Sequence, residues 1–400
     1  MKILLVDDEP FALKLLSHQM ASLGFADSVS MEHAADAITL LESGTETFGL
    51  IFCDLQMPGM DGVEFIRQLA RIGYGGGLVL VSGEDARILQ TAEKLSKAHR
   101  LAVLGSLHKP VSSQQVEQLL ANHAPPARST SNTERKTYGP DELSRAIDGG
   151  QLVNHYQPKV DVRSGALVGV ETLVRWSHPE DGLVFPDQFI ATAEEHELID
   201  ALTHAVLTAA LPQSRRWMDA GLHLHVAVNV SMDNLGSLGF PDWVARAAEV
   251  AGMPLTNLVL EVTESRLMSN PLASLDILTR LRLKHIGLSI DDFGTGHSSL
   301  AQLRDIPFDE LKVDRGFVHG AGFDPPLRTI FEASLGMAQQ LGMKTVAEGV
   351  EDLTDWALLR ASGCDTAQGY FIGRPMPAAD LPGWLADWQN RLPALLAVGE

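Results

Sequence analysis

Six short apolar segments in the C-terminal part of this chain each lead directly into a carboxylate, an amide or a lysine. They are residues 167–170 before Glu171, 225–228 before Asn229, 258–260 before Glu261, 287–290 before Asp291 and Asp292, Leu311 before Lys312, and 345–347 before Glu348. Helical patterns separate these segments, so they predict parallel strands buried in a barrel. Polar groups at the C-terminal ends of barrel strands converge on one mouth. Several carboxylates in one cup repel each other unless cations lie among them, so the sequence predicts a divalent-metal site.

Length and charge narrow the class of protein. A chain of 400 residues exceeds one compact core, so two domains are expected. The formal net charge is −20, with 51 acidic against 31 basic residues. Such a chain is expected to bind neither nucleic acid nor an anionic membrane, and a phosphate-ester substrate would need metal ions to supply local positive charge.

Several features predict a cytoplasmic protein. Cys53 and Cys364 lie among apolar or small residues without metal-ligand spacing, as buried thiols do in a reducing compartment. The apolar N-terminal segment, residues 3–6, is too short for a signal peptide, and no segment approaches the length of a membrane span.

The chain divides into three parts by pattern. Residues 1–122 alternate apolar and amphipathic segments, which predicts a doubly wound (βα)5 domain with a parallel sheet. Its strands are expected at 3–6, 50–53, 78–81 and 101–104, with a weaker one at 28–30. Residues 123–140 begin with a Pro-, Ser- and Thr-rich stretch and are expected to form a linker. Residues 141–400 are expected to form a (β/α)8 TIM-like barrel.

Five chemically active side chains follow strands of the N-terminal domain. They are Asp7, Asp8, Asp54, Ser82 and Lys109. The carboxyl ends of the strands in a doubly wound sheet form one crevice, so these groups are expected to meet. Two acids can hold Mg²⁺, a third can attack phosphorus, and the lysine and hydroxyl can contact phosphoryl oxygens. A single aspartate after a strand is more often a turn residue, but five such groups in this order favour a phosphoryl-transfer site.

This set, together with the segment from Asp54 to Gly62, resembles the receiver domain of bacterial response regulators. The resemblance implies that Asp54 accepts a phosphoryl group from a cognate histidine kinase, with Mg²⁺ bound in the domain. One position departs from the family: Ser106, three residues before Lys109, stands where many receivers carry a switching aromatic residue.

The C-terminal motifs favour a two-metal hydrolase when they are taken together. Singly, Glu171 could form a salt bridge with Arg175, Asn229 could sit in a turn, and Glu261 and Glu264 could cap a helix. The adjacent Asp291 and Asp292, followed by glycines, suit a bridging carboxylate between two cations. Oxygen ligands without a Cys or His cluster favour Mg²⁺ or Mn²⁺ over Zn²⁺. A single-metal barrel with Lys312 as a base is the alternative, and the acid pair and Glu348 weigh against it.

The order of motifs from about 150 to 390 resembles the EAL domain, the bacterial cyclic-di-GMP phosphodiesterase. The motifs are Gln157-Pro158-Lys159, Glu171-x-Leu173-x-Arg175, Asn229, Glu261-Val262-Thr263-Glu264, Asp291-Asp292-Phe293-Gly294-Thr295-Gly296, Lys312-Val313-Asp314-Arg315, Glu348-Gly349-Val350-Glu351, Gln368-Gly369-Tyr370 and Arg374-Pro375. The namesake triplet reads Glu-Thr-Leu here, and His297 stands where the family often has tyrosine.

The resemblance implies a role for each matching side chain. Glu171, Asn229, Glu261 and Asp291 hold the first metal, and Asp291, Asp292 and Glu348 hold the second. Lys312 positions or polarises the nucleophilic water. Glu264 anchors the loop after Asp292, and Gln157, Arg175 and Gln368 are candidates for substrate contact.

The expected function is hydrolysis of cyclic-di-GMP to linear 5′-pGpG, controlled by phosphorylation of Asp54. Two alternatives remain: a non-catalytic cyclic-di-GMP receptor, and a regulator that only recruits a partner. By analogy with both families, a homodimer or homotetramer is expected.

Overall fold

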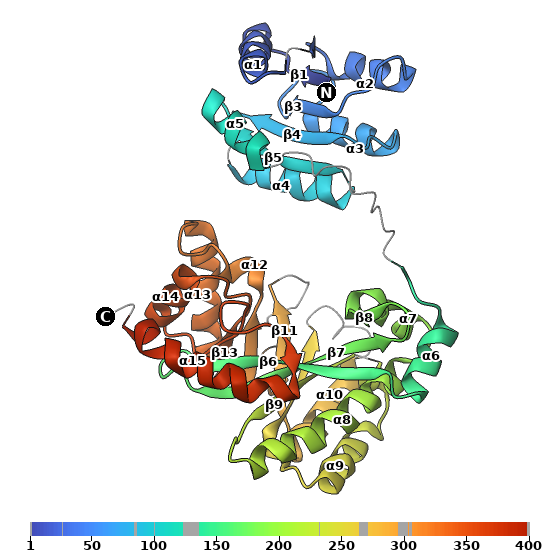
Figure 1. Ribbon diagram of the computed structural model, residues 1–400, viewed down its shortest axis with the longest axis vertical. Helices are drawn as coiled ribbons and strands as arrows, with labels where there is room; N and C mark the ends of the chain where they lie inside the picture. The colour runs from blue at the N-terminus through green and yellow to red at the C-terminus, as the bar shows by residue number, and fades with distance from the viewer. Residues whose placement is uncertain are drawn as a thin grey trace. The chain divides into compact units, whose positions relative to one another are not determined.

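The computed structural model describes residues 2–25, 27–83, 86–99, 101–122, 136–231, 233–263, 271–294, 303 and 306–397. Its internal contacts divide the chain into two compact units, Met1–Asn132 and Thr133–Glu400 (Figure 1). Most of the expected linker, residues 123–135, lies outside the described residues. Tyr138, near the end of that expected linker, packs against Trp176 of the second unit, with ring centroids 4.7 Å apart.

The first unit is a parallel five-stranded sheet in the order β2-β1-β3-β4-β5, the flavodoxin-like order of doubly wound folds. Its strands are β1 Ile3–Val6, β2 Ser28–Met31, β3 Leu50–Asp54, β4 Gly77–Ser82 and β5 Ala102–His108. Its helices are α1 Pro10–Ser22, α2 Ala34–Ser43, α3 Gly62–Arg71, α4 Ala86–Ala98 and α5 Ser113–Asn122. The five expected strands are therefore confirmed, although β5 begins one residue later and continues to His108.

Successive side chains of each strand point to opposite faces of this sheet, so the unit has two apolar cores, one on each face. On β1, Leu4 and Val6 pack toward α2, α3 and α4, whereas Ile3 and Leu5 pack toward α1 and α5. This is the pattern expected of strands that are buried on both faces. With both faces of the sheet covered by helices, the carboxyl ends of the strands form the polar edge of the unit.

The second unit contains a closed barrel. Within the described residues, eight strands form the ring, in the order β6-β14-β13-β12-β11-β10-β9-β7 and back to β6. They are β6 Leu152–Asp161, β7 Leu167–His178, β9 His225–Val230, β10 Leu258–Thr263, β11 Gly287–Phe293, β12 Glu310–Val313, β13 Lys344–Ala347 and β14 Thr366–Ala367. Two short strands, β8 Gly182–Val184 and β15 Met376–Pro377, extend the sheet at β7 and β6.

One strand departs from the expected all-parallel arrangement. Strand β6 pairs antiparallel with β7 on one side and with β14 on the other. The tight connection between β6 and β7 is possible only because they are antiparallel, since a parallel pair requires a long crossover. The barrel is therefore TIM-like with one reversed strand.

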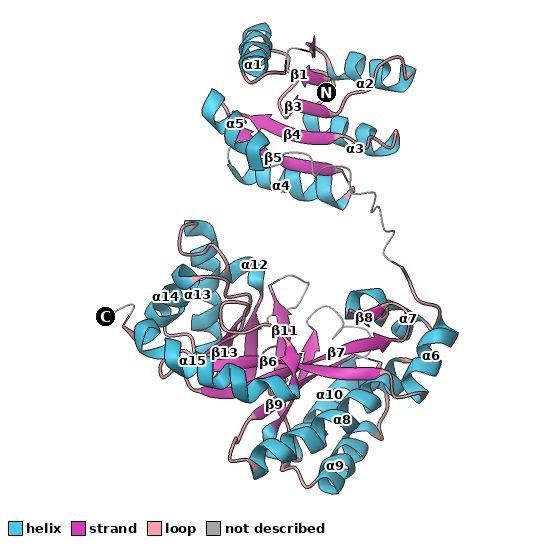
Figure 2. Cartoon of the chain, viewed as in Figure 1, coloured by secondary structure: helices cyan, strands magenta, loops and turns pink. Residues whose placement is uncertain are grey.

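Helices cover the outside of the barrel (Figure 2). They are α6 Pro140–Asp148, α7 Ile190–Glu195, α8 Ile199–Asp219, α9 Phe240–Ala251, α10 Pro271–Leu283, α12 Arg315–Val318, α13 Pro325–Gln340, α14 Leu353–Ser362 and α15 Leu381–Leu396. One continuous apolar cluster joins the strands to these helices. Within the described part of the chain, no helix combines the length and apolarity needed to cross a bilayer.

Candidate active site

The mouth of the barrel collects the carboxylates that the sequence singles out. Asn229, Asp291 and Lys312 lie near the C-terminal ends of β9, β11 and β12, and Glu348 follows β13. Glu261 pairs in register with Asn229 on one side and with Ser289 on the other. Neighbouring strands therefore bring these side chains to the same mouth of the barrel.

Glu171 is an exception to the expected placement at a strand end. It lies within β7, which continues to His178, so the expectation that the apolar segment 167–170 ends its strand was wrong. The strand continues because residues beyond Glu171 pair with β6, and Glu171 lies directly opposite Gln157. Opposite residues of an antiparallel pair project from the same face, so Gln157 and Glu171 enter the mouth together.

An irregularity in β11 accounts for the two adjacent aspartates. The register between β11 and β12 shifts between Ile290 and Phe293, as it does at a β-bulge. Asp292 adopts the left-handed conformation, with φ of +56°, which aspartate tolerates better than most residues. A bulge redirects a side chain out of strict alternation, so Asp291 and Asp292 both contribute to the same carboxylate cluster.

The Lys312 ammonium is the centre of the cluster. Its Nζ lies 2.9 Å from Glu261 Oε2, 2.9 Å from Asp291 Oδ1, 2.6 Å from Glu348 Oε1 and 3.8 Å from Glu171 Oε2. The side chain is 1% exposed. A lysine as deeply buried as this one can keep its positive charge because several carboxylates surround it.

Burial and the two buried lysines shift the pKa values of three glutamates in the cluster in different directions. Burial raises the pKa of Glu348 to about 8, although the Lys312 charge opposes the shift. Burial also raises the pKa of Glu171, against the charge of Lys312. Burial alone would raise the pKa of Glu261, but Lys159 and Lys312 together lower it to about 2. The negative charge is therefore well stabilised at Glu261 and poorly stabilised at Glu171 and Glu348.

The donor set fits a pair of divalent cations. One oxygen from each of Glu171, Glu261 and Asp291 lies within 4.8 Å of the others, and the same holds for Asp291, Asp292 and Glu348. The two groups share Asp291. The two groups contain five different carboxylates, which outnumber the two buried lysines beside them, Lys159 and Lys312, so divalent cations would offset their excess charge.

The amide side chains form the wall beside Glu171. Asn229 Nδ2 donates to Glu171 Oε1 at 2.8 Å, and Gln368 donates to Glu171 and, at 3.0 Å, to Gln157 Oε1. Both glutamines line the mouth cavity of about 260 Å³. Arg175 does not line that cavity; its guanidinium lies 5.0 Å from the Phe185 ring centroid.

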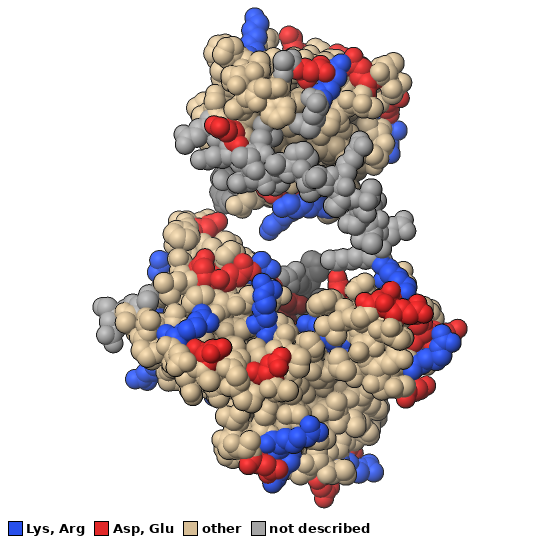
Figure 3. Space-filling view, in the orientation of Figure 1, with Lys and Arg blue, Asp and Glu red and all other residues tan. Residues whose placement is uncertain are grey.

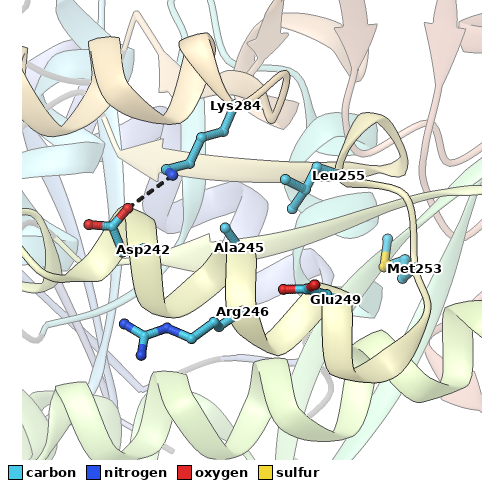
Figure 4. Close-up of a pocket in the computed structure, with 7 residues that line it drawn as sticks. All are labelled: Asp242, Ala245, Arg246, Glu249, Met253, Leu255 and Lys284. Atoms are coloured by element: carbon cyan, nitrogen blue, oxygen red, sulfur yellow. Dashed lines mark ion pairs between the residues drawn. The ribbon is translucent and has the colours of Figure 1, made fainter.

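A larger cavity of about 590 Å³ lies on the outside of the barrel, between α9 and Lys284 (Figure 4). The picture shows Asp242 and Lys284 directed at each other. They form an ion pair with a distance of 2.9 Å. No described group of carboxylates converges there. In the space-filling view, charges of both signs are scattered over the drawn face of this unit (Figure 3). The mouth therefore differs from this outer cavity by its concentration of charged side chains and not by its volume.

The first unit brings its expected groups together as well. Lys109 Nζ lies 2.8 Å from Asp7 Oδ2 and 2.9 Å from Asp54 Oδ2. Carboxylate oxygens of Asp7, Asp8 and Asp54 lie within 4.8 Å of one another. Ser82 ends β4, beside Asp54 at the end of β3. Burial raises the pKa of Asp54, and the hydrogen bond and charge of Lys109 oppose that shift.

Two residues singled out from the sequence lie outside the described part of the chain, and three others had no expected role. Glu264 and His297 lie outside the described residues, so the expected loop-anchoring role of Glu264 stays a prediction. Lys159 had no expected role, yet its Nζ lies 2.6 Å from Glu261 Oε1. Arg315 and Tyr370 also line the mouth without an expected role. All three belong to the quoted motifs, which is the signal that could have identified them.

Comparison with known proteins agrees with the geometry. The model of the EAL domain matches residues 141–375, and that of the response regulator receiver domain matches residues 3–121. The protein "Cyclic di-GMP phosphodiesterase RocR" of Pseudomonas aeruginosa is 32% identical over 379 residues, 94% of this chain and 96% of that protein. "Cyclic di-GMP phosphodiesterase NbdA" of the same species is 45% identical over 246 residues, which are 61% of this chain and 31% of that protein.

A solved structure supports the same assignment for the barrel. The PaMucR phosphodiesterase in complex with c-di-GMP is 42% identical, with a TM-score of 0.58, over 60% of this chain and 98% of that one. The family models together span both units, and RocR matches along nearly the whole length. The chain thus belongs to the EAL domain family, and its EAL barrel follows an N-terminal response regulator receiver domain.

Proposed function

We propose that the barrel hydrolyses cyclic-di-GMP to linear 5′-pGpG with the aid of two divalent cations, Mg²⁺ or Mn²⁺. The observation that carries this proposal is the pair of carboxylate groups that share Asp291 around Lys312. The names of the similar RocR and NbdA proteins support the substrate class. The experiment that tests it is a metal-dependent hydrolysis assay on the full chain.

The residues at the mouth would divide the work. Glu171, Asn229, Glu261 and Asp291 would hold one cation, and Asp291, Asp292 and Glu348 the other. The cations would offset phosphate charge and lower the pKa of a water molecule. Lys312 would orient that water and stabilise the negative charge that develops on the phosphoryl oxygens.

Gln157, Gln368 and Arg175 are our candidates for contact with the guanine or phosphate groups. Gln157 and Gln368 line the mouth beside Glu171, which supports a contact near the scissile phosphate. The water oxygen would form a new bond to phosphorus, and the bond from phosphorus to the 3′-oxygen would break. The leaving 3′-oxygen takes a proton, so the product carries a 5′-phosphate and a 3′-hydroxyl.

A non-catalytic cyclic-di-GMP receptor is the second candidate on this fold. Such a receptor needs no complete ligand set, whereas this mouth contains every carboxylate that the two-metal assignment requires. The complete set favours turnover over binding alone. Binding of cyclic-di-GMP without hydrolysis, in the presence of Mg²⁺ or Mn²⁺, would support the receptor instead.

We further propose that a cognate histidine kinase phosphorylates Asp54 in the cytoplasm, with Mg²⁺ bound near Asp7 and Asp8. A phosphoryl group adds about −1.5 to −2 charges, which Mg²⁺ and Lys109 would offset. Movement of Ser82 and Lys109 toward the new oxygens would bias the loops that follow β4 and β5. The domain boundaries of this proposal are 1–122 and 141–400, joined by a linker at 123–140, and the assembly is a homodimer or homotetramer.

Phosphorylation is expected to raise the hydrolysis rate, and the Asp54→Asn variant is expected to lose this response. The reason is that Asp54, at the end of β3, is the expected phosphoryl acceptor, and its carboxylate lies 2.9 Å from Lys109, which would contact the new phosphoryl oxygens. The measurement is the rate of cyclic-di-GMP turnover before and after treatment with a small phosphoryl donor. Asp36→Asn, on the exposed face of α2, is the matched control and should respond like the wild type. One common rate for the wild type, treated or untreated, and for Asp54→Asn would contradict gating.

A further inference from the structure

A second buried lysine lies beneath the carboxylate cluster. Gln157 and Lys159 are alternate residues on β6, so both face the inside of the barrel. Because β6 runs antiparallel to its neighbours, Lys159 lies deeper in the barrel than Gln157. Its side chain is 6% exposed, and its Nζ lies 2.6 Å from Glu261 Oε1.

The two lysines divide the oxygens of Glu261 between them. Lys159 donates to Oε1 at 2.6 Å, and Lys312 donates to Oε2 at 2.9 Å. The Glu261 side chain is fully buried. Rotation of this carboxylate would break both bonds and leave a buried charged oxygen without a partner, which is costly. Glu261 is therefore held in one orientation.

Lys159 is itself anchored from the other side. Its Nζ lies 3.4 Å from Glu310 Oε1, and this same oxygen accepts a hydrogen bond of 3.0 Å from Ser289 Oγ. Glu310 begins β12, so the anchor lies toward the N-terminal end of the barrel. Lys159 and Glu310 also line a cavity of about 620 Å³ at that end, together with Lys344.

We propose that Lys159 is a positioning residue for the reaction, because it occupies Oε1 of Glu261 and leaves Oε2 to face the metal site and Lys312. This inference rests on the proposed two-metal function. A lysine that acted only through its charge would repel cations, so its removal would strengthen metal binding. A positioning lysine has the opposite effect, because its removal leaves Glu261 free to turn away from the cation.

The test is Mn²⁺ binding to the full chain without substrate, followed by electron paramagnetic resonance, with turnover measured in parallel. Lys159→Met keeps the length of the side chain and removes the ammonium. It is expected to weaken one of the two Mn²⁺ sites, and turnover, by about 10- to 100-fold, as the loss of an outer partner of a metal ligand does. Lys344→Ala, which removes an exposed lysine from the same cavity, should match the wild type. Unchanged or tighter Mn²⁺ binding in Lys159→Met would overturn the proposal.

A rescue experiment separates positioning from a general loss of structure. Lys159→Ala removes the atoms that n-propylammonium contains, and the cavity beside Lys159 gives this cation a path to the site. Added n-propylammonium should restore a measurable part of the turnover, whereas n-propanol should not. Equal effects of the two additives, or none from either, would count against the proposal.

Two further measurements cover a variant that fails to fold and a failure of the proposed function itself. If Lys159→Met does not fold, the Glu310→Gln variant tests the proposal instead. It retains both lysines and weakens only the contact of Glu310 with Lys159, so about tenfold weaker Mn²⁺ binding is expected. Wild-type Mn²⁺ affinity in Glu310→Gln would then overturn the proposal. The wild type in the same buffer tests the proposed function separately: if it neither binds two Mn²⁺ ions nor hydrolyses cyclic-di-GMP, the proposed function fails, whatever the variants do.

Discussion

Replacement of Lys312 by alanine is expected to lower the turnover of cyclic-di-GMP by about 1,000-fold or more. The Lys312 ammonium contacts Glu261, Asp291 and Glu348 within 3 Å and is almost completely buried. Its loss removes the positive side chain at the centre of the cluster and leaves the surrounding carboxylates in mutual repulsion. The measurement is the steady-state rate of hydrolysis at saturating Mg²⁺ or Mn²⁺.

A matched control shows whether this effect belongs to the mouth. Lys284 lies on the outside of the barrel, where it pairs with Asp242 (Figure 4). Lys284→Ala removes the same side chain from the same domain and should retain the wild-type rate. Turnover of Lys312→Ala within tenfold of the wild type would show that the reaction takes place elsewhere.

Asp291→Asn is expected to have an effect as large as that of Lys312→Ala, and to abolish metal binding more completely than Glu171→Ala. Asp291 belongs to both carboxylate groups, whereas Glu171 belongs to one. In the proposed two-metal site, a neutral amide at this position would remove the negative ligand that both cations share. We therefore expect Asp291→Asn to reduce turnover by about 1,000-fold and to lower Mn²⁺ occupancy at both sites.

The control for this variant is Asp242→Asn. Asp242 forms surface ion pairs with Arg280 and Lys284 and is 47% exposed, so the change should leave turnover and Mn²⁺ binding intact. The assignment of a bridging ligand would be contradicted if Asp291→Asn retained one full-affinity Mn²⁺ site and the wild-type rate.

The parts of the fold that were predicted correctly are those with strong local patterns. The segment 3–6 is continuous in apolar residues and buried on both faces, and β1 spans the same residues. Strand β6 gives no such signal, because Asn154, His155, Gln157 and Lys159 interrupt its apolar residues. Its reversed direction depends on closure of the ring with β14, which is far away in sequence. Local periodicity cannot predict a pairing of that kind.

The candidate site, like the fold, was predicted from the sequence only in part. The sequence predicted which carboxylates meet, because polar residues near the ends of neighbouring strands converge. It did not predict the hydrogen bond between Lys159 and Glu261, which are 102 residues apart. That contact depends on the depth of each side chain within the barrel. The depth of a side chain depends on the direction and register of its strand. A shift of one residue in register moves a side chain from the inside of the barrel to the outside.

We propose that the carboxylate cluster at the mouth performs metal-dependent hydrolysis of cyclic-di-GMP. The most direct measurement is the identity of the product formed by the full chain, with Mg²⁺ or Mn²⁺, with excess chelator, and in the Asp291→Asn variant. We expect linear 5′-pGpG from the wild type with metal, and intact cyclic-di-GMP in the other two reactions. Full turnover in excess chelator, or no turnover by the wild type with either metal, would contradict the claim.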